Sequence, residues 1–411
     1  MRDELIDPHA RIVVIGAGQA GFTACAKLRD LGHQGPVTLI GEEAHPPYQR
    51  PPLSKGYLLG EITEGRLYFR PLSFYEERSI DLRLSATATA IDRDGKAVAL
   101  TDGATIAYDR LILTTGARPR TLPTDIGGDL DGVFCVRSLA DINAMVERFR
   151  LDQRVLIVGG GYIGLEAAAV AAKLGLKVTV IEAAPRILQR VACPETSAYF
   201  RHLHGQRGVT LLEGAALEAL EGEDGRVRYA RLVDGSVIPV DFVIAGVGVI
   251  PNVELAEAAG LSIDNGIAVD ENCRTSDPHI YAAGDCASFP WSSGRIRLES
   301  VGNAIEQAEA VARSLTGMPS RYDAKPWFWS DQYDVKLQIA GLSAGYDNVV
   351  TRLGAAGSVS YWYYRGEQLL AVDAMNEPRV YMVAKRLIEA GRSPSAEIVS
   401  DPATDLKSLL L

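Results

Sequence analysis

Long apolar runs, clustered cysteines and clustered histidines are all missing from this sequence of 411 residues. No apolar run approaches the roughly 18 residues that a membrane-spanning helix needs. The start, Met-Arg-Asp-Glu-Leu, lacks the basic-then-apolar order of a signal peptide. The five cysteines and six histidines are dispersed, without the spacings of zinc sites, iron–sulfur clusters or a disulfide framework. We therefore expect a cytoplasmic protein that has no membrane segment and no metal site.

Excess positive charge is also missing. The chain carries 42 Lys and Arg residues against 52 Asp and Glu residues, a formal net charge of -10 at pH 7. This balance argues against nucleic acid as a partner, although a local basic patch can still bind an acidic protein. With 47% hydrophobic and 23% charged residues, the composition is that of a globular protein, and the length suits two or three domains.

The sequence contains two copies of one glycine-rich dinucleotide-binding fingerprint. In each copy an apolar run, typical of a buried parallel strand, leads into three spaced glycines and a helical stretch that ends at a further glycine. The spaced glycines are Gly16, Gly18 and Gly21 in the first copy, and Gly159, Gly161 and Gly164 in the second. They permit a tight turn, close approach of the backbone to a pyrophosphate, and close packing of helix on strand. The pyrophosphate then lies at the helix N-terminus, where N–H groups and the helix dipole favour negative charge.

Each fingerprint is followed, about 20 residues later, by a second apolar run that ends in an acid, as ribose binding requires. The acids are Glu42 and Glu182. Two dinucleotide sites in one chain indicate electron transfer between two cofactors. Glu182 disfavours NADP, whose 2′-phosphate would meet a carboxylate, so we expect NADH in the second site. Arg186 and Arg190 lie downstream and could still attract that phosphate, which leaves the alternative open.

The order of these patterns predicts an α/β fold with two Rossmann-like dinucleotide-binding domains and a C-terminal α+β domain. Apolar strands near 110–114 and 242–245 lead to glycine and proline, where the chain is expected to leave and re-enter the first domain. Beyond about residue 320, aromatic residues and alternating strands replace the earlier pattern, and a basic helix follows. The expected domains are 1–114 with 246–320, then 115–245, and finally 321–411.

Together these motifs closely resemble the NADH-dependent, FAD-containing reductases that supply 2Fe–2S ferredoxins in bacterial cytochrome P450 and ring-hydroxylating oxygenase systems. The resemblance covers essentially the whole chain and rests on residues 48–55, 114–117, 159–166, 246–252, 283–286 and 327–333. Two segments are specific to a much smaller group of proteins than the fingerprints are, namely Arg-Pro-Pro-Leu-Ser-Lys and Trp-Phe-Trp-Ser-Asp-Gln. The resemblance implies a glutathione reductase-like arrangement, with FAD in the split outer domain and NADH in the inserted one. The C-terminal domain would shield the flavin and help present it to the ferredoxin.

Carried over residue by residue, the resemblance implies two sets of cofactor contacts. For FAD these are Gly16, Gly18, Ala20 and Gly21 at the pyrophosphate, Glu42 at the adenosine ribose, and Arg50, Lys55, Ala88, Thr115, Gly116, Arg137, Gly284, Asp285, Val301 and Trp329 around the rest of the cofactor. For NAD they are Gly159, Gly161, Tyr162, Ile163, Gly164, Glu182, Arg190, Gly246 and Gly248. Asp285 also has a physical rationale, because a carboxylate at a strand end can accept ribityl hydroxyls while the following helix N-terminus faces the isoalloxazine.

The resemblance also implies the chemistry, in which NADH delivers a hydride to the flavin and single electrons pass on to the ferredoxin. Lys55 would lie at the flavin N5 edge and pair with Glu166, in the first turn of the second fingerprint helix, to support the anionic reduced flavin. The alternative is a structural salt bridge between domains, and both roles can hold together. Trp329 would lie beside the isoalloxazine. On a regular strand it shares a face with Trp327, whose alternative role is core packing.

An acidic ferredoxin would need positive charge on this chain for docking. The candidates are Arg70, Lys385, Arg386 and Lys407.

The nearest rival is a pyridine-nucleotide disulfide reductase, which needs a redox-active cysteine after the second strand. Residues 42–60 contain no cysteine, and Cys25 has the setting of a small packing residue inside a helix. An NADH oxidase, a rubredoxin or monodehydroascorbate reductase, and a flavin-based NADH sensor remain open alternatives.

Overall fold

The computed structural model describes residues 7–292, 294–319 and 321–410. In it the chain forms two compact units, each built from three segments. The first unit contains Met1–Gln49, Glu64–Arg118 and Ile250–Lys325, and the second contains Arg50–Thr63, Pro119–Val249 and Pro326–Leu411. The three-domain division with boundaries at 114, 245 and 320 stays a prediction. Its residue 320 lies outside the described residues, as do residues 1–6, on which the expectation about a signal peptide rests.

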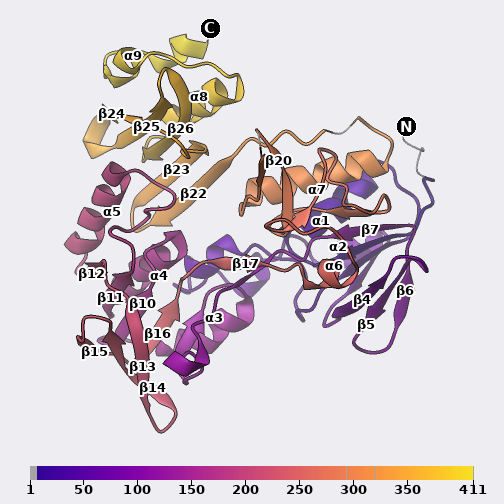
Figure 1. Ribbon diagram of the computed structural model, residues 1–411, viewed down its shortest axis with the longest axis horizontal. Helices are drawn as coiled ribbons and strands as arrows, with labels where there is room; N and C mark the ends of the chain where they lie inside the picture. Colours follow the sequence, from indigo (N-terminus) through magenta and orange to yellow (C-terminus); the bar gives the residue numbers. More distant parts are fainter. Residues whose placement is uncertain (1–6, 293, 320, 411) are drawn as a thin grey trace. The chain divides into compact units, whose positions relative to one another are not determined.

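The first unit is built on a sheet of five parallel strands in the order β19-β7-β1-β2-β3 (Figure 1). The strands are β1 (Ile12–Ile15), β2 (Val37–Ile40), β3 (Ile80–Arg83), β7 (Arg110–Leu113) and β19 (Ile280–Ala282). Every residue of β1 and β2 is buried, as expected of parallel strands that are covered on both faces. The two apolar runs of the first fingerprint are therefore neighbouring strands of one sheet.

Helices cover one face of this sheet and a layer of strands covers the other. α1 (Gln19–Asp30) and α7 (Val301–Leu315) lie side by side, with Ala24 and Ala308 in one core (Figure 1). On the opposite face, Val98 and Leu100 of an antiparallel ladder pack against the sheet. Further elements of this unit are β4 (Ala88–Asp92), β5 (Ala97–Leu100), β6 (Thr105–Ala107), β18 (Ile267–Ala268), β20 (Ala287–Trp291), β21 (Gly294–Ile296), α2 (Leu72–Glu77), α6 (Glu254–Ala258) and the 3-10 helix η2 (Glu64–Arg66).

The second unit contains another parallel sheet, in the order β12-β11-β10-β16-β9. Its strands are β9 (Val133–Cys135), β10 (Arg154–Val158), β11 (Lys177–Glu182), β12 (Thr210–Glu213) and β16 (Phe242–Ala245). Its helices are α3 (Leu139–Met145), α4 (Tyr162–Lys173) and α5 (Pro194–Gln206), and its antiparallel ladder is β13 (Leu217–Glu223), β14 (Arg226–Leu232) and β15 (Val237–Pro239). The order β10-α4-β11 repeats β1-α1-β2 of the first unit, so the two fingerprints occupy equivalent positions.

Short elements complete the backbone of the second unit and its connections. They are the 3-10 helices η1 (Pro51–Ser54), η3 (Thr124–Ile126), η4 (Val146–Arg148), η5 (Ala355–Gly357) and η6 (Leu406–Leu410). The strands β8 (Ala117–Pro119) and β17 (Val249–Pro251) pair with each other, and each includes a point at which the chain passes from one unit to the other.

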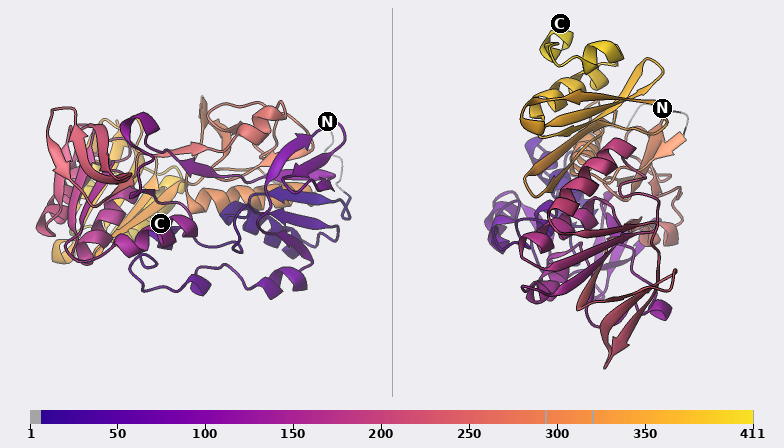
Figure 2. Two further views of the ribbon diagram at one scale, coloured as in Figure 1. Left: turned by 90° about the horizontal axis from the view of Figure 1, so that it is seen from below. Right: turned by 90° about the vertical axis from the view of Figure 1, so that its left-hand side faces the viewer.

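The C-terminal part of the second unit is an antiparallel sheet in the order β22-β23-β26-β25-β24. Its elements are β22 (Trp327–Gln332), β23 (Val335–Gly341), β24 (Asn348–Leu353), β25 (Val359–Arg365), β26 (Gln368–Met375), α8 (Pro378–Glu389) and α9 (Ala396–Ser400). Side chains alternate along β25. Trp362 and Tyr364 join the core under α8, on the side that carries the helices (Figure 2), whereas Tyr361 and Tyr363 join a core that residues of α4 and α5 share. This second core holds the C-terminal sheet and the second fingerprint in one unit.

The strands and helices expected around the two fingerprints are confirmed. α1 ends two residues before Gly32 and α4 ends two residues before Gly175, and both glycines have left-handed backbone, with φ of 85° and 80°. Among the helices that the structure describes, none is long and apolar enough to cross a membrane.

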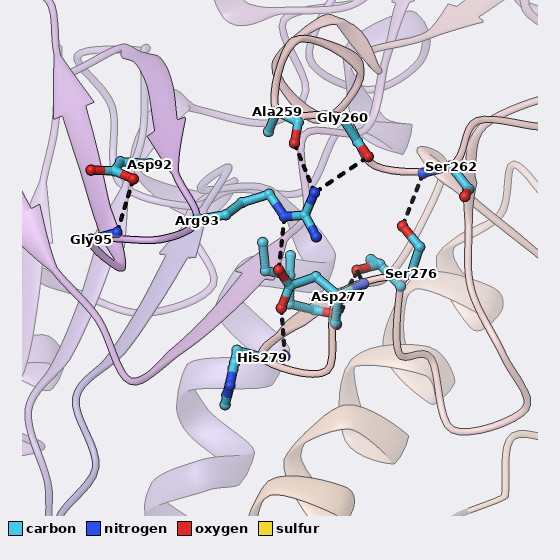
Figure 3. A network of polar contacts seen from close by, with 11 residues as sticks. Asp92, Arg93, Gly95, Ala259, Gly260, Ser262, Ser276, Asp277 and His279 are labelled. Carbon is cyan, nitrogen blue, oxygen red and sulfur yellow. Dashed lines mark hydrogen bonds and ion pairs between the residues drawn. The ribbon is translucent and has the colours of Figure 1, made fainter.

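A partly buried ion pair in the first unit joins the turn after β4 to the end of α6 and to the loop before β19 (Figure 3). Arg93, in the turn after β4, donates from Nε to Asp277 Oδ2 (2.8 Å) and from Nη1 to the carbonyl oxygen of Ala259 (3.3 Å), just after the end of α6. Asp277 is 7% exposed, and its Oδ1 accepts the N–H of His279 (2.8 Å). The guanidinium thus caps the negative end of α6 and neutralises a buried carboxylate at the same point.

A second buried carboxyl lies where the C-terminal sheet meets α5. Asp373 of β26 is 1% exposed, and its Oδ2 accepts hydrogen bonds from the hydroxyls of Thr196 (2.7 Å) and Tyr363. The Tyr363 oxygen accepts the N–H of Cys193 in turn (3.0 Å). Burial raises the pKa of Asp373 to about 6, although both hydroxyls oppose the shift.

The free energy of unfolding should depend on pH through Asp373. Because its folded pKa lies above the unfolded value, the folded state binds more protons between about pH 4 and pH 6, and stability falls as pH rises through that window. Asp373→Asn keeps an oxygen for both hydroxyls and should exceed wild type in stability by about 2 kcal/mol above pH 6. Calorimetry from pH 4 to pH 8 checks this, and a Tm difference that does not vary with pH would contradict it.

Arg93→Ala should lower the free energy of unfolding at pH 7 by about 1–3 kcal/mol, because it leaves Asp277 buried without a counter-ion. Burial alone would raise the pKa of Asp277, but the bonds from Arg93 and the His279 N–H outweigh it and lower that pKa. The contribution is therefore present at neutral pH and is lost as pH falls below about 4. Arg78→Ala, which removes an exposed pair with Asp30, is the matched control. Equal losses in the two variants by urea denaturation would refute the assignment.

Candidate active site

The first glycine loop leaves room only for hydrogen at two of its glycines. Gly16 has a φ of 111°, and a Cβ there would overlap the carbonyl oxygen of Thr114. A Cβ on Gly21 would overlap the carbonyl oxygen of Gly16, so α1 packs directly on the loop. At Gly18, by contrast, a Cβ would meet nothing within 4 Å. The tight turn and the close helix packing therefore need glycine, while the middle of the loop opens onto free space.

The second loop has the same geometry. Gly159 has a φ of 109°, and a Cβ there would approach the carbonyl oxygen of Gly246 to 2.5 Å. A Cβ on Gly164 would overlap the carbonyl oxygen of Gly159, and one on Gly161 would meet nothing within 4 Å. Gly246, a predicted NAD contact at the end of β16, thus forms the wall of this loop.

Both loops fit the pyrophosphate of a dinucleotide. Gly18 and Gly161 are the N-caps of α1 and α4, and among the described residues no side chain caps either helix. Neither helix has an acidic residue in its first turn. Neither helix therefore places a carboxylate of its own first turn at the N–H groups and the positive end of the dipole, where a diphosphate would bind.

The two predicted ribose-binding acids lie beside their loops. Glu42 is exposed just after β2, where Gly41 lies so close to Ala17 of the first loop that a Cβ would stand 2.6 Å from the alanine Cβ. Glu182 ends β11 and is held more firmly, because its two oxygens accept the N–H groups of Gly160 (2.7 Å) and Ala184 (2.8 Å). Each acid therefore lies close to its glycine loop, and its contact with a ribose stays a prediction.

The two arginines that could attract a 2′-phosphate differ in their contacts. Arg186 donates to the Ser197 hydroxyl (2.6 Å) and to the carbonyl oxygen of Cys193 (3.3 Å), so its guanidinium serves the start of α5. Arg190 is exposed, and its Nη2 lies 3.8 Å from the position of a Cβ on Gly248. The structure thus brings together Arg190 and Gly248, two of the predicted NAD contacts.

Other predicted FAD contacts gather in the first unit. Gly284 has a φ of 85°, its N–H donates to Gln307 (2.8 Å), and a Cβ there would lie 3.1 Å from that of Ala20. Thr115 donates from its hydroxyl to the carbonyl oxygen of Asn252 (2.6 Å), whose amide donates back to the Thr115 carbonyl (2.8 Å). Of the remaining positions, Ala88 begins β4, Gly116 precedes β8, Asp285 follows Gly284 and Val301 begins α7.

The second unit holds the other predicted FAD contacts, Arg50, Lys55, Arg137 and Trp329. Arg50 donates to the carbonyl oxygen of Arg137 (2.8 Å), which brings two of them together. Trp327 and Trp329 stack with ring centroids 5.6 Å apart, which confirms that they share one face of β22. Both are partly exposed.

Lys55 and Glu166 form the ion pair that the resemblance suggested. Lys55 Nζ lies 2.7 Å from Glu166 Oε2 and 3.2 Å from the carbonyl oxygen of Pro51. The hydroxyl of Ser54 donates to the same Glu166 oxygen (2.7 Å), and that of Ser330 donates to Oε1 (2.7 Å). Glu166 is 4% exposed. One detail is corrected, because α4 begins at Tyr162 and Glu166 therefore lies just beyond its first turn.

The two hydroxyl donors of Glu166 were not predicted as site residues. Ser54 and Ser330 lie inside the two specific segments on which the resemblance rests. The sequence alone does not show which carboxylate a given serine hydrogen-bonds.

The two residues at the start of α4 differ in exposure. The Tyr162 ring packs against Phe328 with centroids 5.0 Å apart, and Ile163 is 42% exposed.

The predicted docking residues divide between the two units. Arg70 is exposed in the first unit, with its guanidinium 5.7 Å from the centroid of the Phe74 ring. In the second unit, Lys385 pairs with Glu389 along α8, while Arg386 and Lys407 are exposed on α8 and η6. Lys385 therefore contributes less free positive charge than Arg386 or Lys407.

Four of the five cysteines are buried in settings that do not favour thiol redox chemistry. All five are free, and Cys25, Cys193, Cys273 and Cys286 are buried. Burial raises the pKa of each, that of Cys25 to about 12. A buried thiol with a raised pKa supplies little thiolate at neutral pH, so none of these four is suited to be the nucleophile of a disulfide reductase.

Comparison with known proteins identifies two families along the chain. Residues 10–308 match the pyridine nucleotide-disulphide oxidoreductase family, and residues 327–410 match the reductase C-terminal family. The chain is 42% identical to rhodocoxin reductase of Rhodococcus erythropolis over 399 residues, which cover 96% of this chain and 93% of that protein. It is 40% identical to putidaredoxin reductase of Pseudomonas putida over 416 residues, which cover 98% of each chain.

A solved structure agrees with these matches. The covalent complex of putidaredoxin reductase with putidaredoxin superimposes with a TM-score of 0.95 at 40% identity, over 98% of this chain and 99% of that chain. The resemblance, the fold of two dinucleotide-binding parts with a C-terminal domain, the oxidoreductase class and the cofactors FAD and NAD(H) are thereby confirmed. The assignment of individual residues to each cofactor stays a prediction. The chain belongs to the pyridine nucleotide-disulphide oxidoreductase family and carries a reductase C-terminal domain.

Proposed function

We propose that this chain is an NADH:ferredoxin oxidoreductase, which passes electrons from NADH through FAD to a 2Fe–2S ferredoxin that serves a cytochrome P450 or a ring-hydroxylating oxygenase. The observation that carries the proposal is the pair of glycine loops with matched geometry in one chain. The full-length likeness to putidaredoxin reductase, which was solved in complex with its own redox partner, supports a ferredoxin as the acceptor.

The two glycine loops and the acids that follow them divide between the two cofactors according to the unit that holds them. The first loop, Glu42 and Asp285 would bind FAD, and the second loop with Glu182 would bind NAD(H). Bound FAD supplies the exchange between hydride chemistry and one-electron transfer. The protein supplies the binding sites and the charges around them, and none of its cysteines is needed.

Lys55 is the residue we propose to act at the flavin. An ammonium has three N–H donors, and the contacts with Glu166 and Pro51 use two of them. The third can donate to a cofactor atom that gains negative charge on reduction. Glu166 fixes the direction of the ammonium, since a buried carboxylate holds its cationic partner strongly.

Docking of the ferredoxin would use the exposed cations among the four candidates. We propose that Arg386, Lys407 and Arg70 steer an acidic partner, with a smaller contribution from Lys385 because Glu389 offsets its charge.

The choice of NADH over NADPH should depend on the charge of Glu182. Glu182→Gln keeps an acceptor for one of the two backbone N–H groups but removes the charge that repels a 2′-phosphate, so the ratio of kcat/KM for NADH to that for NADPH should fall about tenfold. Glu223→Gln, on the exposed end of β13, is the matched control and should leave the ratio unchanged. Steady-state kinetics with both nucleotides gives the ratio. A ratio that stays at the wild-type value in Glu182→Gln would remove Glu182 from the nucleotide site.

Anaerobic stopped-flow absorbance tests the proposed function directly. When purified flavoprotein is mixed with NADH, the absorbance of the oxidised flavin should fall rapidly. The flavin should be reoxidised rapidly only when an oxidised 2Fe–2S ferredoxin is also present. Reduction that several ferredoxins fail to reverse, but oxygen reverses, would favour an NADH oxidase. A long-lived reduced complex that no acceptor discharges would favour a sensor, and a protein without a flavin spectrum would overturn the assignment of the first loop.

A further inference from the structure

A line of buried polar side chains leads away from Glu166 through β22 to α5. Ser330 donates to Glu166 Oε1 (2.7 Å), and the side-chain nitrogen of Gln332 lies 3.1 Å from the Ser330 oxygen. The Gln332 oxygen lies 2.8 Å from His204 Nε2, and His204 Nδ1 lies 3.1 Å from the hydroxyl oxygen of Tyr333. Five side chains from three parts of the second unit thus form one continuous chain of hydrogen bonds.

The local structure explains why these groups meet. Ser330 and Gln332 are two residues apart on β22, so they share the face opposite to the tryptophans. Tyr333 follows with a left-handed φ of 56°, and its ring packs edge-on against that of His204, with centroids 5.1 Å apart. Ser330, Gln332 and His204 are all 0% exposed, so each depends on the others for its hydrogen bonds. His202, two residues before His204, is exposed instead.

The negative charge on Glu166 determines which atom donates and which accepts in every hydrogen bond of this series. A carboxylate only accepts, and Ser330 has one hydroxyl hydrogen, which it therefore gives to Glu166. The Ser330 oxygen must then accept from the amide nitrogen of Gln332. The Gln332 oxygen faces His204 Nε2, which has to be the donor, and this leaves Nδ1 of a neutral ring to accept from Tyr333. Reversing the amide would leave Ser330 facing two acceptors with one hydrogen.

The ionisation of the two outer groups agrees with this direction. Burial lowers the pKa of His204, against an opposing contribution from Gln332, so the ring is neutral at neutral pH. Burial raises the pKa of Tyr333, so its hydroxyl keeps the hydrogen that it donates. The guanidinium of the neighbouring Arg207 lies 5.1 Å from the centroid of the Tyr333 ring and forms an ion pair with Asp334.

We propose that Gln332 and His204 are positioning residues for the Lys55–Glu166 pair. By presenting the Ser330 hydroxyl to Oε1, they hold the carboxylate in the orientation that leaves Oε2 to Lys55 and Ser54. The direction of the chain also means that the charge of Glu166 sets the tautomer of His204. The kinetic part of this inference rests on the proposed function, whereas the tautomer does not.

Histidine-selective nitrogen-15 labelling of the purified holoprotein tests the chain without NADH or ferredoxin. The sequence has six histidines, and His204→Gln identifies the signal of interest. Wild-type His204 should show a single tautomer with hydrogen on Nε2. Ser330→Ala cuts the link to Glu166 and should redistribute the tautomers. Ser54→Ala, which removes a donor from the other carboxylate oxygen, is the matched control and should leave the His204 signal unchanged.

Single-turnover reduction of the flavin by NADH tests the positioning role. Ser330→Ala and Gln332→Leu should each slow reduction by roughly tenfold, because small displacements of a positioned group cost large factors in rate. The NADH concentration at half-maximal rate should stay within about twofold, since neither residue lies in the nucleotide loop. Use of two variants guards against a folding defect in one of them.

The outcomes separate the inference from the proposed function. A wild-type His204 with hydrogen on Nδ1, or with both nitrogens protonated, would overturn the directed chain. A tautomer change in Ser330→Ala without slower flavin reduction would overturn the positioning role. Failure of ferredoxin to accept electrons would defeat the proposed function and would leave the tautomer result standing.

Discussion

The packing of the second unit requires a counter-ion and hydrogen-bond donors for one buried carboxylate, that of Glu166. Glu166 is 4% exposed, and a charge at such depth is tolerated only with a counter-ion and further hydrogen bonds. Its partners come from separate segments, since Ser54 and Lys55 belong to the short stretch Arg50–Thr63 and Ser330 belongs to the C-terminal sheet. Satisfying Glu166 therefore fixes the position of both segments against α4. The same contacts that remove the cost of burial also aim the Lys55 ammonium.

The two glycine loops show how little sequence is needed to repeat a binding geometry. Gly16 and Gly159 have φ values within a few degrees of each other, and each loop presses against the carbonyl oxygen that follows a neighbouring strand. In the first loop that oxygen belongs to Thr114, and in the second to Gly246. Backbone atoms thus set the shape of both sites. Side chains set the difference between them, because Glu182 is bound into its loop and Glu42 is exposed.

Much of the fold and part of the site could be predicted from the sequence, because regular patterns carried them. The apolar runs, the spaced glycines and the helix-ending Gly32 and Gly175 are local signals, and the structure confirms the elements they predicted. Contacts between distant residues have no such signal. The bond between Gln332 and His204 and the pair of Arg93 with Asp277 join positions far apart in the chain, and many polar residues could have served equally well. Lys55 and Glu166 were paired in advance only through the resemblance to a known family.

The alternation along β25 has a consequence for how this architecture can change. One side of the C-terminal sheet shares its core with Leu165 of α4 and Phe200 of α5, whereas the other side is closed by its own helices. A substitution on the side covered by α8 and α9 can be compensated by changes within the C-terminal domain. A substitution on the shared side needs a compensating change in α4 or α5. The domain is therefore not an exchangeable module. A chimera that took it from a relative would need the facing surfaces of both helices from the same donor.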